Sequence, residues 1–371
     1  MLDKTRSFFR AIFIGINLCV ILLYLFVCLV PFINTGKYWF FALPGLAFPL
    51  LFFVLFGFII FWIIFRSKWS WISLVVLLIG FQQIQAVFAF HLPEKFSPER
   101  NANTLRILHW NVRSWDNFPD SNRNEKRYLP DMMHLLKQRN ADVLCFEEYA
   151  DIKNLRDSNS VTSTIMRIGY PHYLFAETKP DEDKFARGVV IFSKYPIVES
   201  DTFNYGENTQ AEHLIYIDIK RGEKIFRIFT THLQSVRFGN SDYESLQRLK
   251  HARDPGYHDS RTIVSKLKTA YHYRYLQAQL VKEKMAESPY PVVITGDFND
   301  VPNSNTYFVI KGKLQDAFLK KGFFIGRTFR FISPTLRIDY ILADKSFKVN
   351  QFQVIHVPYS DHYPIEADLH W

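Results

Sequence analysis

PVVITGDFND, residues 291–300, holds the densest structural and chemical signal in this chain of 371 residues. Its β-branched start, from Val292 to Thr295, predicts a short buried strand. The polar GDFND that follows places two carboxylates and an amide directly where that strand ends. Glycine, asparagine and aspartate also favour tight turns, so this segment on its own is compatible with a plain turn.

Short apolar runs of the same kind recur after residue 104. Most are four to seven residues long and rich in valine, isoleucine and phenylalanine, which favours strands over helices. Helical patterns fall between some of them, at 125–139 and near 260–286. Mixed strands and helices in one block of about 265 residues predict a single α/β domain with two packed sheets. The predicted strands are 105–110, 143–146, 189–192, 214–219, 225–230, 292–295, 338–342 and 352–357.

Polar side chains gather where these predicted strands stop. Each of them alone is compatible with a turn or a solvated strand end. Asp339 differs, because it lies between apolar residues inside a predicted strand, and a buried charge requires a partner or a metal. The residues at strand ends are Asn111, Glu147, Glu148, His232, Gln234, Asp297, Asn299, Asp300, Asp361 and His362.

The set of motifs is much more specific than its members. In chain order, LHWN, FEE, SKYPI, THLQS, GDFN, RIDYIL and SDHYP resemble the endonuclease/exonuclease/phosphatase superfamily, which has the DNase-I-like fold. The resemblance covers about 105–371, nearly the whole polar part of the chain. It implies a four-layer α/β sandwich in which the motifs meet at one rim of the two sheets. It also implies divalent-metal hydrolysis of a phosphate ester.

The resemblance also implies roles for the oxygen-bearing residues. Asn111 and Glu148 would help to hold the metal, normally Mg²⁺ with Mn²⁺ as the alternative. Asp361 would bind metal or hold His362. Asp297 would orient or deprotonate the attacking water, with Asn299 beside it on the phosphate. These residue types suit Mg²⁺, which prefers oxygen ligands and keeps several waters.

The remaining roles concern the histidines. By the same resemblance, His232 would contact the phosphate or assist the leaving group, and His362 would face the phosphoryl oxygens. Asp339 would support a histidine. Phosphoryl transfer requires neutralisation of the phosphate oxygens, and a histidine paired with an aspartate stays oriented and protonated.

The first ninety residues have a different composition. Three runs without charged residues, 11–36, 38–65 and 69–90, each exceed the roughly 20 residues that span a hydrocarbon core. They predict about three transmembrane helices at 11–33, 40–65 and 69–90. Three glutamines in the last run leave open whether it crosses fully. Residues 91–104 then read as a polar linker with two prolines, followed by the catalytic domain, 105–371.

Basic residues near the apolar runs predict the orientation. Cytoplasmic loops carry the excess of lysine and arginine, which places the N-terminus and the second loop in the cytoplasm. Three crossings then put the catalytic domain outside, in an integral protein of the cell or inner membrane; with two crossings the domain would be cytoplasmic. The basic residues are Lys4, Arg6 and Arg10 before the first run, Lys37 in the first loop, and Arg66 and Lys68 in the second.

The net charge of the chain restricts the possible substrate classes only slightly. The net charge of +9 divides into +5 on residues 1–90 and +4 on the remainder, which permits a polyanionic partner without requiring one. Three spans favour a lipid-linked or envelope phosphodiester as substrate. A Mg²⁺-dependent nuclease is the alternative. A catalytically inactive, membrane-anchored binding protein is a third reading, but no expected carboxylate or histidine is missing. The partners are therefore the bilayer and a phosphate ester; no protein partner is predicted.

Residues 236–274 form a long polar stretch within the predicted domain. Eight bases face four acids there, so the segment alone carries +4. Since it begins just after His232, its first residues must lie near the proposed site. We expect either a solvated helix pair or a basic lid that presents anionic groups to the metal.

Overall fold

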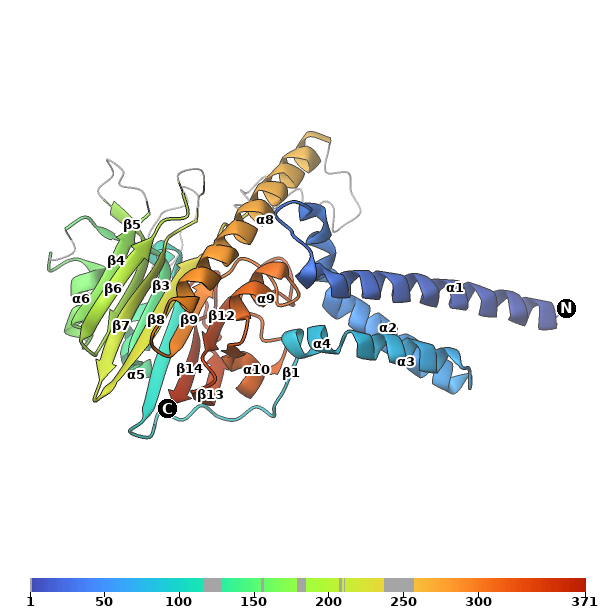
Figure 1. The fold of residues 1–371 in the computed structure, drawn as a ribbon, viewed down its shortest axis with the longest axis horizontal. Helices are drawn as coiled ribbons and strands as arrows, with labels where there is room; N and C mark the ends of the chain where they lie inside the picture. The colour runs from blue at the N-terminus through green and yellow to red at the C-terminus, as the bar shows by residue number, and fades with distance from the viewer. Residues whose placement is uncertain are drawn as a thin grey trace.

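Two six-stranded sheets form the centre of the molecule (Figure 1). The computed structural model describes residues 2–116, 128–154, 157–178, 185–206, 209, 211–236 and 257–371. The first sheet has the order β13 (Lys348–Val354), β14 (Ile365–His370), β2 (Thr104–Asn111), β3 (Val143–Ile152), β5 (Phe185–Ser193) and β4 (His172–Glu177). The second has the order β10 (Gln315–Asp316), β12 (Asp339–Ala343), β9 (Val292–Asp297), β8 (Lys224–His232), β7 (Leu214–Arg221) and β6 (Ile197–Phe203).

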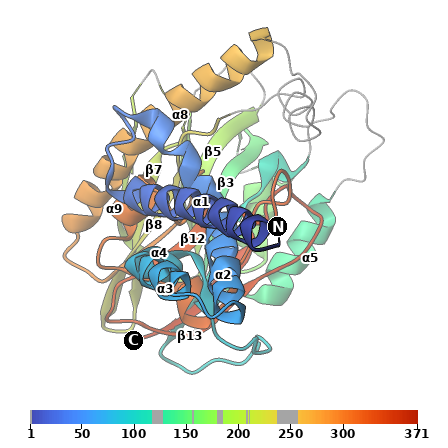
Figure 2. The ribbon, with the colours of Figure 1, turned by 90° about the vertical axis from the view of Figure 1, so that its right-hand side faces the viewer.

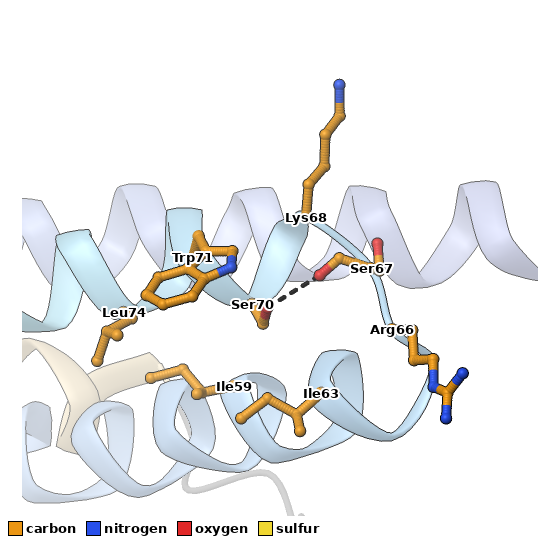
Figure 3. A pocket seen from close by; sticks show the side chains of 8 residues that line it. All are labelled: Ile59, Ile63, Arg66, Ser67, Lys68, Ser70, Trp71 and Leu74. Carbon is orange, nitrogen blue, oxygen red and sulfur yellow. Dashed lines mark hydrogen bonds between the residues drawn. The ribbon is translucent and has the colours of Figure 1, made fainter.

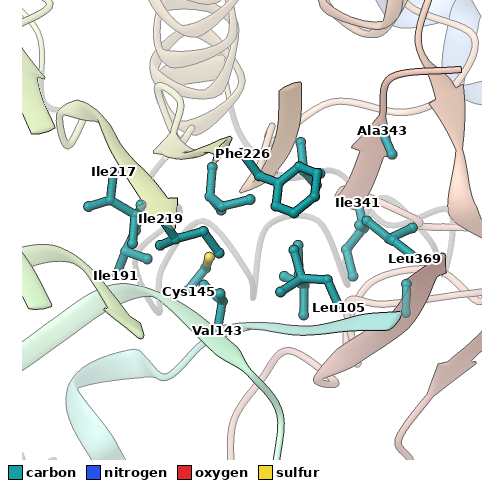
Figure 4. Packing of buried hydrophobic residues seen from close by; sticks show 14 of the residues in the cluster. Leu105, Val143, Cys145, Ile191, Ile217, Ile219, Phe226, Ile341, Ala343 and Leu369 are labelled. Carbon is teal, nitrogen blue, oxygen red and sulfur yellow. The ribbon is translucent and has the colours of Figure 1, made fainter. Parts of the chain in front are cut away.

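The two sheets pack face to face around an apolar core (Figure 4). Leu105 and Val143 of the first sheet and Ile217 and Ile341 of the second are completely buried there. Alternate residues of a strand point to opposite faces, so one face of each predicted run supplies this core. Burial of this apolar area stabilises the sandwich.

Helices cover the outer face of each sheet. On the first sheet, α5 (Leu129–Arg139) and α6 (Val161–Arg167) pack over a second apolar cluster. On the second sheet, α8 (Tyr257–Ala286) and α9 (Asn305–Lys311) do the same. The predicted four-layer α/β sandwich is therefore confirmed.

Some element boundaries differ from those expected. The predicted strand at 352–357 is instead Lys348–Val354, because the chain leaves the sheet after Val354. The predicted helix at 125–139 begins at Leu129, and 117–127 lie outside the described residues. Of the strands in the two six-stranded sheets, β4, β6, β10 and β14 were missed.

The N-terminal part consists of apolar helices. Helix α1 (Leu2–Leu29) and helix α2 (Phe48–Ile64) belong to segments long and apolar enough to cross a membrane. Helices α3 (Trp69–Ile79) and α4 (Phe81–Val87) are bent by 62° and give a third span if the pair counts as one. The bend falls at Gly80, where a Cβ atom would lie 2.1 Å from the Tyr24 hydroxyl oxygen.

Polar contacts and a cavity mark the side of this bundle away from the sheets. Buried Asn17 donates a hydrogen bond to Ser73 Oγ at 3.0 Å and so ties α1 to α3. The turn between α2 and α3 borders a cavity of about 440 Å³ (Figure 3). Ser70 Oγ donates to the Ser67 carbonyl there, at 2.9 Å, while Arg66 and Lys68 flank the turn.

The opposite end of the bundle lies directly against the sandwich domain (Figure 1). After α1, the chain passes through the short helices η1 (Val30–Phe32), η2 (Trp39–Phe41) and η3 (Leu43–Ala47). Asn303 Nδ2 donates to the Val27 carbonyl at 3.1 Å, and Asn305 Nδ2 donates to the Pro31 carbonyl at 2.8 Å. Buried Arg337 donates to the Ala86 carbonyl at 2.7 Å.

The segment predicted as a linker also contacts the domain. It is preceded by β1 (Ala89–Phe90), which pairs with β11 (Phe323–Phe324). The backbone nitrogen of Ser97 donates to Gln351 Oε1 at 2.7 Å, and Arg100 forms an ion pair with Asp142 at 2.7 Å. Residues 91–104 therefore run along the domain surface.

Candidate active site

Strand ends bring the polar motifs together at one rim of the sandwich. The parallel pairs β2–β3 and β8–β9 place their carboxyl ends at this rim, with Asn111 opposite Glu147 and His232 opposite Asp297. Strand β12 begins there at Asp339, also opposite Asp297. Contacts described below connect seven of the residues predicted from the sequence, and the eighth, Asp361, directly precedes His362: Asn111, Glu148, His232, Asp297, Asn299, Asp339 and His362.

Asn111 joins two of the carboxylates. Its Nδ2 donates to Glu148 Oε1 at 3.1 Å and to Asp297 Oδ2 at 3.2 Å. Glu148 lies at a β-bulge with a φ of +47° and keeps 40% of its side chain exposed. Such a conformation is uncommon outside glycine and turns this carboxylate toward solvent at the rim.

His232 is held by an acid that the sequence did not single out. Glu212 Oε2 accepts a hydrogen bond from His232 Nδ1 at 3.1 Å and another from the backbone nitrogen of Glu148 at 2.9 Å. His232 Nε2 is then directed toward Asp297 Oδ2, 3.7 Å away. Burial opposes protonation of His232, but Glu212, Asp297 and Glu148 together raise its pKa to about 10.

His362 is held in the same way by Asp339. The Nδ1 of His362 donates to Asp339 Oδ2 at 2.9 Å, and its Nε2 lies 3.6 Å from Asp297 Oδ2. Burial opposes protonation of His362, but Asp339 and Asp297 raise its pKa well above the usual value. Asp297 thus faces two cationic imidazoles, each oriented by a carboxylate on its other nitrogen.

A further buried histidine lies behind Asp339. His109 Nε2 is 3.2 Å from Asp339 Oδ1, and His109 Nδ1 is 3.2 Å from Glu147 Oε2. Burial opposes protonation of His109, but Glu147 and Asp339 raise its pKa to about 9. Burial would raise the pKa of Asp339, yet His362 and His109 lower it well below its usual range.

Asp297 is poised for proton transfer. Burial raises its pKa, as does Asp339, while His362 and His232 oppose the rise, leaving a value of about 6. A carboxylate with this pKa is ionised at neutral pH and still basic enough to take a proton from water.

Asn299 lies beside Asp297 in a left-handed turn with a φ of +51°. Its backbone nitrogen donates to Asp297 Oδ1 at 2.8 Å, and its Nδ2 donates to the Leu233 carbonyl at 3.1 Å. Buried Arg274 donates to the Asn299 carbonyl and lies 3.7 Å from Asp300 Oδ2. Helix α8 therefore holds the GDFND turn in place.

Asp361 lies on the open side of the site. Its Oδ1 accepts from Ser360 Oγ at 3.1 Å, and its Oδ2 is 3.7 Å from Arg113 Nε. The carboxylate that orients His362 is Asp339, so metal binding is the one of the two predicted roles of Asp361 that stays a prediction.

The donor set fits a hard divalent cation. Partial burial raises the pKa of Glu148, and the nearby carboxylates of Asp361 and Glu212 add to this, against the attraction of His232. A cation between these carboxylates would relieve their mutual repulsion, and oxygen donors with open positions for water are what Mg²⁺ requires. Asn111, Glu148 and Asp361 can therefore hold the ion.

A second arrangement also has suitable ligand atoms. Those of Asp297, Asp339 and His362 all lie within 4.8 Å of one another, and all three residues are buried. Asp339 and His362 are already hydrogen-bonded to each other. This group is a second candidate position for a cation, beside the one at Glu148.

Several residues of the site were missed from the sequence. Glu212 could have been inferred, since it precedes the strand 214–219 whose neighbour ends at His232. His109 alternates with Trp110 in an apolar strand, which indicates a buried histidine but not its partners. Arg274 gives no signal, because one arginine in a basic helix looks like any solvated residue.

The prediction for 236–274 is tested only in part. Residues 237–256 lie outside the described residues, so the proposed lid stays a prediction. Residues 257–274 form the N-terminal half of α8.

Comparisons with known proteins support the fold. Residues 108–362 match the endonuclease/exonuclease/phosphatase family, and residues 10–87 match a domain of unknown function. No curated protein matches the chain. Since all the solved structures below are at most 20% identical, their likeness concerns the fold alone.

Three solved structures illustrate the likeness. An endonuclease/exonuclease/phosphatase from Beutenbergia cavernae is 20% identical, with a TM-score of 0.52 and 72% of each chain covered. The human Nocturnin catalytic domain with bound sulfate anion is 16% identical, with a TM-score of 0.51, covering 72% of this chain and 93% of that one. A mannosyl-6-phosphatase from Bacteroides thetaiotaomicron is 18% identical, with a TM-score of 0.48, covering 72% of this chain and 100% of that one.

The matched region contains every residue of the predicted site and most of the sandwich, without β14 and the first residues of β2. The chain therefore belongs to the endonuclease/exonuclease/phosphatase family, whose members are metal-dependent hydrolases acting on phosphate esters.

Proposed function

We propose that this chain is a membrane-anchored phosphoesterase that uses Mg²⁺ to hydrolyse a lipid-linked or envelope phosphodiester. The observation that carries the proposal is the position of Asp297, with one carboxylate oxygen 3.7 and 3.6 Å from the Nε2 atoms of His232 and His362. A base between two cationic donors suits attack of water on a phosphate.

The residues have distinct tasks in this reaction. Asp297 orients the attacking water and takes its proton, while Asn299 lies beside it on the phosphate. His362 donates to a phosphoryl oxygen, and His232 donates to another oxygen or to the leaving group. Asn111, Glu148 and Asp361 would hold the cation, which would supply Lewis-acid stabilisation of the charge on the phosphoryl oxygens.

The lipid-linked substrate is supported by the position of the site. The Asn303 side chain contacts Val27, near the end of α1, and Asn303 follows Asn299 by four residues. Four residues span at most roughly 14 Å, so the GDFND turn lies near the level of the lipid headgroups if α1 spans the bilayer. A phosphate attached to a membrane lipid is within reach at that level.

The proposal is tested with the full chain in detergent. Hydrolysis of a phosphodiester in the presence of Mg²⁺ should fall by roughly 10²-fold or more in Asp297→Asn, because the base is lost. Removal of the cation with EDTA should abolish hydrolysis, and added Mg²⁺ should restore it. Asp201→Asn, an exposed acid on β6, is the matched control. Full activity of Asp297→Asn or full activity in EDTA would contradict the proposal.

A further inference from the structure

Helix α8 reaches from the sandwich to the level of the membrane helices. Its C-terminal half packs on the second sheet through Ala278 and Val281. Its N-terminal half extends past the sandwich. Along the horizontal axis of Figure 1, its first turns reach as far as the loop that follows α1. Seen along the membrane helices, this end projects beyond them at the top of the view (Figure 2).

One face of this helix points toward the membrane side. His272 Nδ1 donates to the Gly36 carbonyl at 2.9 Å, and a Cβ atom on Gly36 would lie 2.7 Å from the Tyr275 ring. At 3.6 residues per turn, Lys268, Val264 and Arg261 continue the face that His272 begins. All three side chains are exposed, Val264 at 45%.

Gly36 itself lies close to the expected bilayer surface. It follows α1 by seven residues, and aromatic side chains around it are exposed: Phe32 at 61%, Tyr38 at 43% and Phe40 at 50%. Aromatic residues at the end of a span mark the headgroup region. Lys268 and Arg261 lie about 6 and 16 Å further along the helix axis from His272, given a rise of 1.5 Å per residue.

The charge of this segment is basic. Residues 257–274 contain four lysines and arginines and one acid, Asp259. Arg274 is buried against the GDFND turn, whereas Arg261 and Lys268 lie on the exposed face with Val264 between them. Basic residues flanking an apolar one on a single helical face are typical of helices that lie on anionic bilayers.

We propose that the N-terminal half of α8 lies on the bilayer, where Arg261 and Lys268 bind the phosphates of anionic lipid headgroups and Val264 enters the acyl boundary. The bilayer that carries the chain is favoured over a nucleic acid, because this face is continuous with the contact to Gly36 at headgroup level. The inference rests on the membrane anchoring in the proposed function and is independent of the reaction.

A fluorescent reporter on the helix tests this contact. Val264→Cys is made in the full chain with Cys19→Ser, since Cys28 and Cys145 are buried. The labelled chain is placed in nanodiscs of phosphatidylcholine, with or without phosphatidylglycerol. With phosphatidylglycerol, the emission should shift to the blue and be quenched by lipids brominated near the headgroup.

Charge variants show whether the two bases cause the effect. Arg261→Gln with Lys268→Gln should reverse most of the shift and the quenching. Lys282→Gln with Lys348→Gln removes the same charge from exposed positions elsewhere and should leave both unchanged.

Three outcomes would overturn the inference. The first is an emission that is identical in neutral and anionic discs. The second is a blue shift that is retained after both Arg261 and Lys268 are replaced. The third is a blue shift caused by association of labelled copies with one another, which energy transfer between their labels would reveal. Hydrolysis is not measured in this experiment, so its result is separate from that of the activity test.

Discussion

Glu212 shows how a residue outside the reacting set controls the site. Its carboxylate accepts from both His232 Nδ1 and the backbone nitrogen of Glu148, so it fixes a histidine and the proposed metal ligand Glu148 together. Removal of the Glu212 charge therefore disturbs both His232 and Glu148, although both of these residues are still present. Glu212 is a positioning residue, because its contacts with the reaction pass through these two neighbours.

Glu212→Gln should lower kcat by roughly 10- to 100-fold with a smaller change in KM, because His232 loses the charge that keeps it protonated and oriented. The half-saturating Mg²⁺ concentration should rise as well, since Glu148 loses an anchor for its backbone. Steady-state kinetics over a Mg²⁺ series measure both. Glu283→Gln, on the exposed side of α8, is the matched control. A purely structural role would lower the amount of folded enzyme and leave the half-saturating concentration unchanged.

His109 carries a second prediction at this scale. It is completely buried between Glu147 and Asp339 and supplies the cation that both carboxylates face. His109→Leu should destabilise the domain by roughly 3–5 kcal/mol, because buried carboxylates lose their partner. Addition of Glu147→Gln should recover part of this loss.

Thermal unfolding of the full chain in detergent measures these effects. If the double variant unfolds at the same temperature as His109→Leu, the pairing with Glu147 contributes nothing and this account of His109 is wrong.

At the scale of elements, β14 shows why some strands could not be predicted from the sequence. Residues 365–370, IEADLH, place acids between apolar residues and look like a solvated edge. In the sheet, β14 lies between β13 and β2, and its acids are buried. Their partners are distant in sequence: Arg106 lies 2.7 Å from Asp368, and Arg139 pairs with Glu366. Such pairs cannot be read from local composition.

The strand-end motifs were predictable for the opposite reason. Apolar runs ending in Asn111, Asp297 or His232 combine a local pattern with chemistry at one position, and parallel strands then bring those ends together. The family resemblance added the order of the motifs. The partners Glu212, His109 and Arg274 were missed because each depends on tertiary contacts.

Asp368→Ala should destabilise the first sheet by about 3 kcal/mol or more, because Arg106 is 2% exposed and would lose its bidentate partner. At roughly 2–4 °C per kcal/mol for a domain of this size, unfolding should occur at least about 6 °C lower. Thermal unfolding in detergent measures the shift. Asp344→Ala, on the turn after β12, is the comparison. Equal shifts in both variants would contradict a special role for the buried pair.

At the scale of the whole molecule, the two ends of the N-terminal helical bundle have different surroundings. The loop after α1 and the end of α4 contact the catalytic domain, whereas the N-terminus and the turn at Arg66 lie at the far end (Figure 1). This arrangement supports an odd number of crossings. With the basic residues at the far end, it supports a cytoplasmic N-terminus and an external domain.

A reporter fused after Trp371 should therefore behave as extracytoplasmic, and one fused before Met1 as cytoplasmic. Protease added to spheroplasts should cleave the catalytic domain before lysis. A pair of reporters on the same side would mean that α3 and α4 do not cross, and the orientation would then be wrong.

The hydrogen bonds from Asn303 and Asn305 to the end of α1 and the loop after it have a kinetic consequence. They tie the GDFND turn to the apolar helices, so an enzyme that these helices hold in the bilayer, as proposed, cannot leave one vesicle to search another. For a lipid substrate, encounters then occur by lateral diffusion in two dimensions. Turnover would follow the mole fraction of substrate within the bilayer and would be unchanged when more vesicles of the same composition are added. Dilution of the substrate with inert lipid would lower the rate even at constant bulk concentration.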